Sequence, residues 1–185
     1  MRYLTVRRYL QRHGPGVVGH RVGVEAARNI PTMPRTDSAA RVIDAPVARL
    51  FNALVDREAL ESWLPHGGMT ARFERFDPRP GGSYRLVLTY LDPTESRGKS
   101  SADSDIVEAR YVDIVANDRV AQTVDFASDD PAFAGTMTMT WAVQGVGGGT
   151  RVEITADDVP DGISADDHAA GLSSSLDNLA RYVES

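Results

Sequence analysis

The sequence predicts an α+β domain in which an antiparallel sheet has helices packed on one face. Three observations predict this class. Strand-like stretches follow one another between residues 70 and 156, and most are separated by turns of hairpin length. Two short helical patterns precede these strands, and one long helical pattern follows them. Because hairpin-linked strands run antiparallel, we expect a curved sheet of about six to seven strands wrapped round the C-terminal helix.

The first predicted elements are a short strand at residues 39–43 and a helix that begins at Asp44. Pro46 takes the first helical position, where its missing N–H costs nothing. Apolar residues then recur at helical spacing and give this helix one apolar face: Val47, Leu50, Phe51 and Leu54. Asp56 is predicted to cap a second short helix, which carries three apolar residues on one side: Leu60, Trp63 and Leu64.

Six further strands are predicted, at residues 70–76, 82–91, 106–115, 120–126, 136–143 and 151–156. The strand at 136–143 has the clearest alternation, with four large apolar residues on one face: Met137, Met139, Trp141 and Val143. The polar stretch 92–105 is predicted to be a mobile loop. Four glycines within residues 145–149 predict a hairpin loop.

One long helix is predicted to close the chain. Ser164, followed three residues later by Asp167, is a start like a capping box, with aspartate in place of the usual glutamate. Four apolar residues follow at helical spacing and form a stripe: Leu172, Leu176, Leu179 and Val183. His168 lies one turn before the first of them, so we expect it at the edge of this stripe.

Length and composition exclude several classes of protein. A chain of 185 residues, 42% hydrophobic and 25% charged, can bury a core without covalent support. It has no cysteine, which excludes disulfides and thiolate chemistry. It has no apolar run of the roughly 18 residues that a membrane span needs. A net charge of -6 disfavours binding to nucleic acid and to anionic membranes. We therefore expect a cytoplasmic protein that binds neither nucleic acid nor membranes. Nineteen arginines against one lysine indicate a high-GC bacterial genome.

Charge is divided unevenly along the chain. Residues 1–34 hold six arginines and one glutamate, a net charge of +5, whereas residues 35–185 carry a net charge of -11. The basic segment has weak hydrophobic periodicity and a glycine-rich middle, which predicts a disordered extension before a domain at residues 35–185. The alternative is that Met33 is the natural start, because the charge changes sign there and the first strand follows directly.

Several large side chains are candidates for a ligand pocket, because a sheet wrapped round one helix encloses more space than the apolar stripe fills. They are Trp63, Tyr84, Met137, Met139 and Trp141. Methionine adapts to irregular shapes, and tryptophan and tyrosine carry a polar group on an apolar ring, which suits a binding site. The alternative is plain core, for which a methionine and tryptophan face at every second residue is more typical.

No catalytic constellation is recognisable in the sequence. His168 is a candidate ligand contact or base, and the alternative is a structural histidine held by a carboxylate or carbonyl such as Asp167. Arg110 shares a strand face with Glu108, with which it is predicted to pair unless it orients an anionic head group. The four histidines have no metal-binding spacing, so neither a metal site nor a cofactor is predicted.

Several short motifs occur in a defined order between residues 38 and 184. They are Ile43-Asp44-Ala45-Pro46, Trp63-Leu64, the run from Phe76 through Gly81-Gly82 to Tyr84, Gly148-Gly149-Thr150-Arg151-Val152, Asp167-His168-x-x-Gly171 and Leu176-x-x-Leu179-Ala180. In this order and spacing the chain resembles the START-like (SRPBCC) superfamily. Within it, the chain is similar to bacterial homologues of the activator of the heat-shock-protein-ninety ATPase.

The resemblance implies a helix-grip fold with a hydrophobic cavity between the sheet and the C-terminal helix. A binding protein for a small hydrophobic or amphipathic molecule is expected, and many relatives carry tryptophan in place of Leu172, which predicts a wider pocket there. The candidate ligand-binding residues are Trp63, Tyr84, Arg110, Met137, Met139, Trp141, His168 and Leu172.

Two alternatives to binding stay open. One is a cyclase- or hydrolase-like enzyme in the same cavity, in which His168, or Arg110 with Glu108, handles protons. Binding is favoured over this enzyme, because no acid–base pair is set by spacing. The other is an interaction module that regulates a chaperone. It is not favoured, because residues 1–34 are too short for the extra N-terminal domain of the eukaryotic activator.

Overall fold

The computed structural model describes residues 34–65, 68–91, 104–126 and 130–185. Three predictions lie outside the described residues: the N-terminal extension apart from its last residue, the start at Met33, and most of the loop at 92–105. In chain order, the elements are β1 (Asp37–Ile43), α2 (Val47–Val55), α3 (Arg57–Trp63), β2 (Met69–Phe76), β3 (Ser83–Tyr90), β4 (Ser104–Val115), β5 (Arg119–Phe126), β6 (Gly135–Val146), β7 (Gly149–Asp157) and α4 (Ala165–Glu184).

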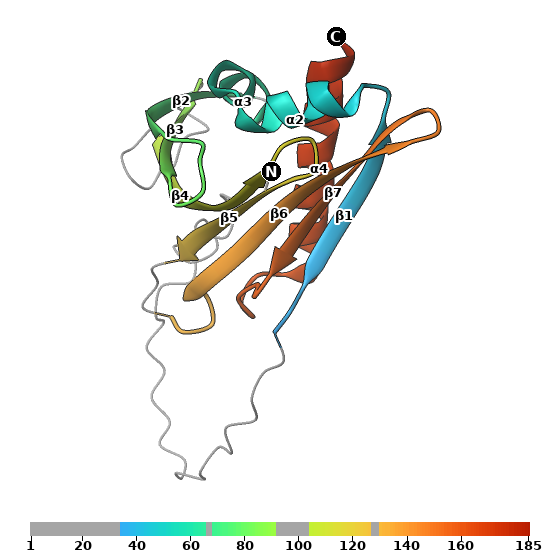
Figure 1. Cartoon of the computed structure of the whole chain (residues 1–185). Helices are drawn as coiled ribbons and strands as arrows, with labels where there is room; N and C mark the ends of the chain where they lie inside the picture. The colour runs from blue at the N-terminus through green and yellow to red at the C-terminus, as the bar shows by residue number, and fades with distance from the viewer. Residues whose placement is uncertain (1–33, 66–67, 92–103, 127–129) are drawn as a thin grey trace, which may run out of the picture.

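The seven strands form one antiparallel sheet in the order β1-β7-β6-β5-β4-β3-β2. Every strand after β1 pairs with its neighbour in the chain, and β1 returns to pair with β7. The register shifts between Phe73 and Arg75 and between Tyr111 and Asp113. Such irregularities bend strands and increase twist, and the sheet curves round α4 (Figure 1). The predicted α+β fold with two short helices after the first strand is confirmed.

Helix starts follow the predicted capping residues. The Asp56 carboxylate accepts a hydrogen bond from the Ala59 N–H at 2.9 Å and begins α3. The Ser164 hydroxyl accepts one from the Asp167 N–H at 3.4 Å and begins α4. Pro46 is the residue before α2 and not its first helical residue, a shift by one position of the kind common at helix ends.

Strand boundaries differ slightly from the predicted ones. The first strand begins at Asp37, and β4 begins at Ser104, so the predicted loop at 92–105 is too long at its C-terminal end. Strands β6 and β7 extend to Val146 and from Gly149, which leaves a two-residue turn at Gly147 and Gly148. The prediction of a five-residue loop was therefore wrong, because strand pairing continues into the glycine-rich stretch.

The apolar core is one continuous cluster between the sheet and the helices. The predicted stripe of α4 is at its centre, with exposures of 0% to 2% for Leu172, Leu176, Leu179 and Val183. The alternation predicted for β6 is confirmed, because Met137, Met139, Trp141 and Val143 are buried. None of the helices in the described part of the chain is long and apolar enough to cross a membrane.

Candidate functional site

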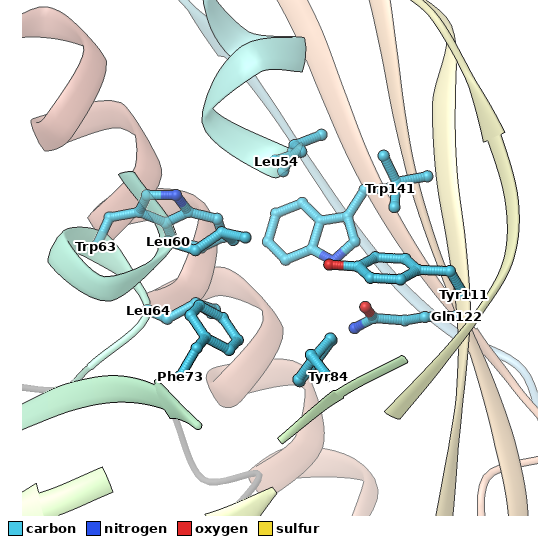
Figure 2. A pocket seen from close by; sticks show the side chains of 10 residues that line it. Leu54, Leu60, Trp63, Leu64, Phe73, Tyr84, Tyr111, Gln122 and Trp141 are labelled. Atoms are coloured by element: carbon cyan, nitrogen blue, oxygen red, sulfur yellow. The ribbon is translucent and has the colours of Figure 1, made fainter. Parts of the chain in front are cut away.

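A small cavity of about 30 Å³ lies between the two short helices and the inner face of the sheet (Figure 2). Its wall combines residues from α2, α3, the end of α3 and strands β2 to β6: Leu54, Leu60, Trp63, Leu64, Phe73, Tyr84, Tyr111, Val120, Gln122 and Trp141. The cavity exists here because α2 and α3 cover strands whose inward residues are large rings that do not fill the space completely.

Aromatic rings form most of the wall and pack against one another. The ring centroids of Trp63 and Trp141 lie 5.3 Å apart at an interplanar angle of 72°. Tyr84 packs edge-on against Phe73, with ring centroids 5.4 Å apart, and in a tilted arrangement against Tyr111, with centroids 5.6 Å apart. Edge-to-face contacts of this kind are favourable beyond the area that they bury. The aromatic part of the wall therefore comes from four strands and one helix.

Three polar side chains interrupt this apolar wall: Tyr84, Tyr111 and Gln122. Burial raises the pKa of Tyr84 to about 12, although a hydrogen bond with the side chain of Gln122 acts in the opposite direction. Burial also raises the pKa of Tyr111, and the neighbouring Tyr84 adds to the effect. Both phenols are consequently neutral at physiological pH and available as hydrogen-bond donors.

The lining residues differ in their exposure to solvent. Eight of the ten lining residues are buried, and only Leu64 and Gln122 are half-buried. We take the side at these two residues, the most exposed ones of the lining, as the opening of the cavity. None of the ten lining residues carries a charge.

Helix α3 is attached to the free edge of the sheet by two charged side chains. Strand β2 is an edge strand, and the backbone of Phe73 is bonded on its outer side by α3. The Glu61 carboxylate accepts a hydrogen bond from the Phe73 N–H at 2.7 Å, and the Arg57 guanidinium donates one to the Phe73 carbonyl. Arg57 and Glu61 also pair with each other at 3.3 Å. These contacts occupy the edge groups that another strand would use and hold α3 over the cavity.

We expect Glu61→Ala to lower the free energy of unfolding by about 1 kcal/mol, because the Phe73 N–H loses its half-buried acceptor. The amide of Phe73 is then expected to exchange its hydrogen faster, which NMR-detected exchange measures. Glu58→Ala is the matched control, because Glu58 is exposed on the same helix. Equal exchange at Phe73 in the two variants would contradict the role of Glu61.

The structure brings only some of the predicted site residues together. Trp63, Tyr84 and Trp141 line the cavity. Met137 and Met139 face inward on the same strand as Trp141 and are buried, but neither lines the cavity. Leu172 is 0% exposed within the core, and none of the lining residues comes from α4. This cavity lies beneath α2 and α3 and has no lining residue from α4, so it is a different place from the expected cavity between the sheet and α4.

His168 is held by a carboxylate on a distant strand. Its Nδ1 atom lies 2.7 Å from the Asp37 carboxylate, which also accepts hydrogen bonds from Arg35 at 2.6 to 3.2 Å. The alternative of a structural histidine is thus supported, with the Asp37 carboxylate as a partner. Arg35 further donates to the Ile163 carbonyl at 2.6 Å, so this cluster joins the start of β1 to the start of α4.

Arg110 lies on the exposed outer face of the sheet, away from the cavity. The predicted ion pair between Arg110 and Glu108 is wrong. Glu108 pairs with Arg85 at 2.9 Å, because Arg85 is directly opposite it on β3. Facing residues of paired strands are closer than residues two apart on one strand. Within the described residues, no group of three or more His, Asp or Glu side chains is arranged to hold a metal ion.

Sequence reasoning missed several lining residues, notably Phe73, Tyr111 and Gln122. Each faces inward on a strand that was predicted. The available signal was alternation, since Phe73 and Tyr111 occupy inward positions on β2 and β4. What alternation does not reveal is which inward residues lie beneath α3, because that depends on the strand order and on where the helix packs.

The fold and the enclosed aromatic cavity define this protein as a START-like domain of the helix-grip type. Comparison with known families gives a narrower assignment. The profile of the family described as Activator of Hsp90 ATPase homolog 1-like protein matches residues 44–184, and the chain belongs to this family.

Solved structures agree with this assignment. A crystal structure of a protein from Chromobacterium violaceum is 29% identical, covers 81% of this chain and 97% of its own chain, and has a TM-score of 0.67. A protein from Rhizobium leguminosarum is 26% identical, with coverages of 83% and 99% and a TM-score of 0.57. The solution structure of an AHSA1-like protein from Aeromonas hydrophila is 18% identical, with coverages of 81% and 92% and a TM-score of 0.65, a likeness in fold alone. Among curated proteins, none matches the chain.

Proposed function

We propose that this protein binds a small hydrophobic or amphipathic molecule in the cavity beneath α2 and α3. The observation that carries the proposal is the cavity wall, which combines five aromatic rings with the amide of Gln122. Binding sites for small molecules are mostly apolar and aromatic, with a few polar groups that orient the ligand. A cytoplasmic location, and a lack of nucleic-acid and membrane partners, stay predictions from composition.

Ligand entry requires the cavity to enlarge. A volume of about 30 Å³ holds only one or two water molecules, so a ligand must displace part of the wall. Helix α3 is the element best suited to move, because it has only seven residues and packs on the edge strand of the sheet, although its bonds to Phe73 must then break. Its Leu60 and Trp63 side chains form one wall of the cavity, so a shift of α3 opens the space directly.

Tryptophan fluorescence tests this proposal, because its signal comes from the cavity wall. The chain has two tryptophans, and both line the cavity. A panel of lipids and polyketide-like ring compounds is added at increasing concentration, and native mass spectrometry establishes the stoichiometry of any complex. A saturable change in emission together with a complex of one ligand per chain supports the proposal. If no compound of the panel produces either signal, the proposal is wrong.

A substitution at the opening separates the cavity from other binding surfaces. We expect Gln122→Phe to weaken binding at least about tenfold, because a phenyl ring fills the mouth and removes the amide. Thr123→Phe is the matched control, since Thr123 is half-buried on the same strand but faces the other side of the sheet. Dissociation constants come from the fluorescence titration. Equal weakening in both variants would place the ligand elsewhere.

A further inference from the structure

Two buried side chains present hydrogen-bond donors to the cavity. The hydroxyl of Tyr111 and the indole nitrogen of Trp141 both point toward its centre (Figure 2). Tyr111 is 1% exposed and Trp141 is 6% exposed. The structure shows no hydrogen bond for either group among the described residues, and both polar atoms remain accessible to a water-sized molecule from the cavity. The indole nitrogen of Trp63 differs, because it donates to the Ala53 carbonyl at 2.9 Å.

These donors indicate what kind of atom belongs in the cavity. An indole N–H donates and does not accept, so a group in the cavity that bonds to it must be an acceptor, either a water molecule or an atom of a ligand. One acceptor oxygen placed in the cavity satisfies both groups, and a ligand oxygen does so without immobilising a water molecule. The Gln122 amide bonds to Tyr84 and keeps further hydrogen-bonding capacity for a ligand near the opening, whereas Tyr111 and Trp141 present donors deeper in the cavity.

The wall offers no compensation for a charged ligand. None of the ten lining residues is ionised, so a carboxylate or ammonium group would be buried without a counter-charge, at a large cost. The two nearby charges, Arg57 and Glu61, pair with each other and with the Phe73 backbone. Cation–π attraction does not replace a carboxylate, because it needs an accessible ring face. The rings here pack against one another, at 5.3 Å for the two tryptophans and 5.6 Å for the two tyrosines.

Resting on the proposed function, we infer that the ligand is an uncharged ring compound that carries a hydrogen-bond acceptor oxygen, such as a carbonyl. The ring packs between the aromatic walls, and the oxygen accepts hydrogen bonds from the Tyr111 hydroxyl and the Trp141 indole N–H. The site thereby discriminates against fatty acids and other anionic amphiphiles, which many hydrophobic cavities accept by means of a basic residue.

Four probes that share one phenyl ring test this inference. They are acetophenone, which is neutral with an acceptor, ethylbenzene, which is neutral without one, benzoate as the anion, and benzylammonium as the cation. Each is titrated at pH 7 into the full chain labelled with nitrogen-15, and the two indole N–H signals are followed by NMR. Trp63→Phe assigns the two signals. We expect acetophenone to bind at least about fivefold more tightly than ethylbenzene, and the two ions to bind at least about thirtyfold more weakly than acetophenone.

Tyr111→Phe removes one donor and leaves the ring in place. In this variant, acetophenone is expected to lose most of its advantage over ethylbenzene. Tyr182→Phe on α4 is the matched control and keeps the advantage, because Tyr182 is exposed and does not line the cavity. The spectrum of each variant without probe shows whether the fold is preserved.

The outcomes separate this inference from the proposed function. If benzoate or benzylammonium binds as tightly as acetophenone, the inference is wrong and binding in the cavity stands. The same holds if acetophenone and ethylbenzene bind equally. If none of the four probes shifts either indole signal, both the inference and the proposed function are wrong.

Discussion

Gly149→Ala is expected to lower the free energy of unfolding by at least about 3 kcal/mol. Gly149 begins β7 with φ at +143°, a conformation that residues with a Cβ rarely adopt. A Cβ atom there would lie 2.3 Å from the Ile43 carbonyl oxygen and 3.3 Å from the Asp44 Cα atom. Because both contacts are to backbone atoms, relief requires the junction of β1 and α2 to move away from β7. Denaturation by urea, monitored by circular dichroism, measures the loss.

Gly147→Ala is the control for this prediction. It lies two residues earlier in the same glycine-rich turn, and a Cβ atom there would meet nothing within 4 Å. We expect a change within about 0.5 kcal/mol, as for most surface substitutions. A similar loss of stability in the two variants would mean that the close approach of Gly149 to the Ile43 backbone is not what requires glycine.

Asp37→Asn is expected to cost about 2–3 kcal/mol of stability at pH 7, because it removes the shared carboxylate of a mostly buried cluster. Asp37 accepts hydrogen bonds from Arg35 at 2.6 Å and lies 2.7 Å from the His168 Nδ1 atom. His168 is 5% exposed, so its ring loses a partner that water does not easily replace. The substitution also loosens the attachment of β1 to the start of α4. Thermal and urea unfolding measure the loss.

The effect of Asp37 depends on pH in a defined direction. Burial disfavours the Asp37 carboxylate, but hydrogen bonds from Arg35 and His168 and their positive charge outweigh this, so the pKa of Asp37 lies below its ordinary value of 3.8. A carboxyl with a lowered pKa in the folded state stabilises above its unfolded value, and this contribution is lost as the pH falls through the folded value. The difference in stability between the wild type and Asp37→Asn is therefore expected to be largest above about pH 5 and to shrink below pH 3.8.

Asp177→Asn is the matched control for Asp37→Asn. Asp177 pairs with Arg41 on the surface of α4, and both side chains are exposed. Exposed pairs contribute little, so we expect a change within about 0.5 kcal/mol and no comparable pH dependence. If both variants lose the same stability, burial of the Asp37 cluster is not the cause.

Local patterns were sufficient to predict most of the fold. Alternation identified the strands, and the buried row at Met137, Met139 and Trp141 confirms its face. Capping at Asp56 and Ser164 located two helix starts to the residue. These features depend on neighbours within a few positions, and so a sequence displays them directly. The order and spacing of the motifs then indicated the family.

The candidate site was predicted only in part. Trp63, Tyr84 and Trp141 were identified because large amphipathic rings on predicted inward faces are suited to binding. Tyr111 and Gln122 were missed, and Leu172 and Met137 were included, because inward position does not separate a cavity wall from filled core. Fewer than half of the predicted lining residues belong to the cavity.

The sequence by itself determined the elements, their faces and the α+β class, because these follow from periodicity and local hydrogen bonding. Only the tertiary structure decided the partners. The Asp37 carboxylate contacts His168, which is 131 positions away in the chain. Glu108 pairs with Arg85 and not with Arg110, because the strand register places Arg85 directly opposite it. The helix α3 rests on the edge of β2, and this placement creates the cavity and its unpartnered donors. Such contacts depend on how strands far apart in the chain are aligned, which no local pattern encodes.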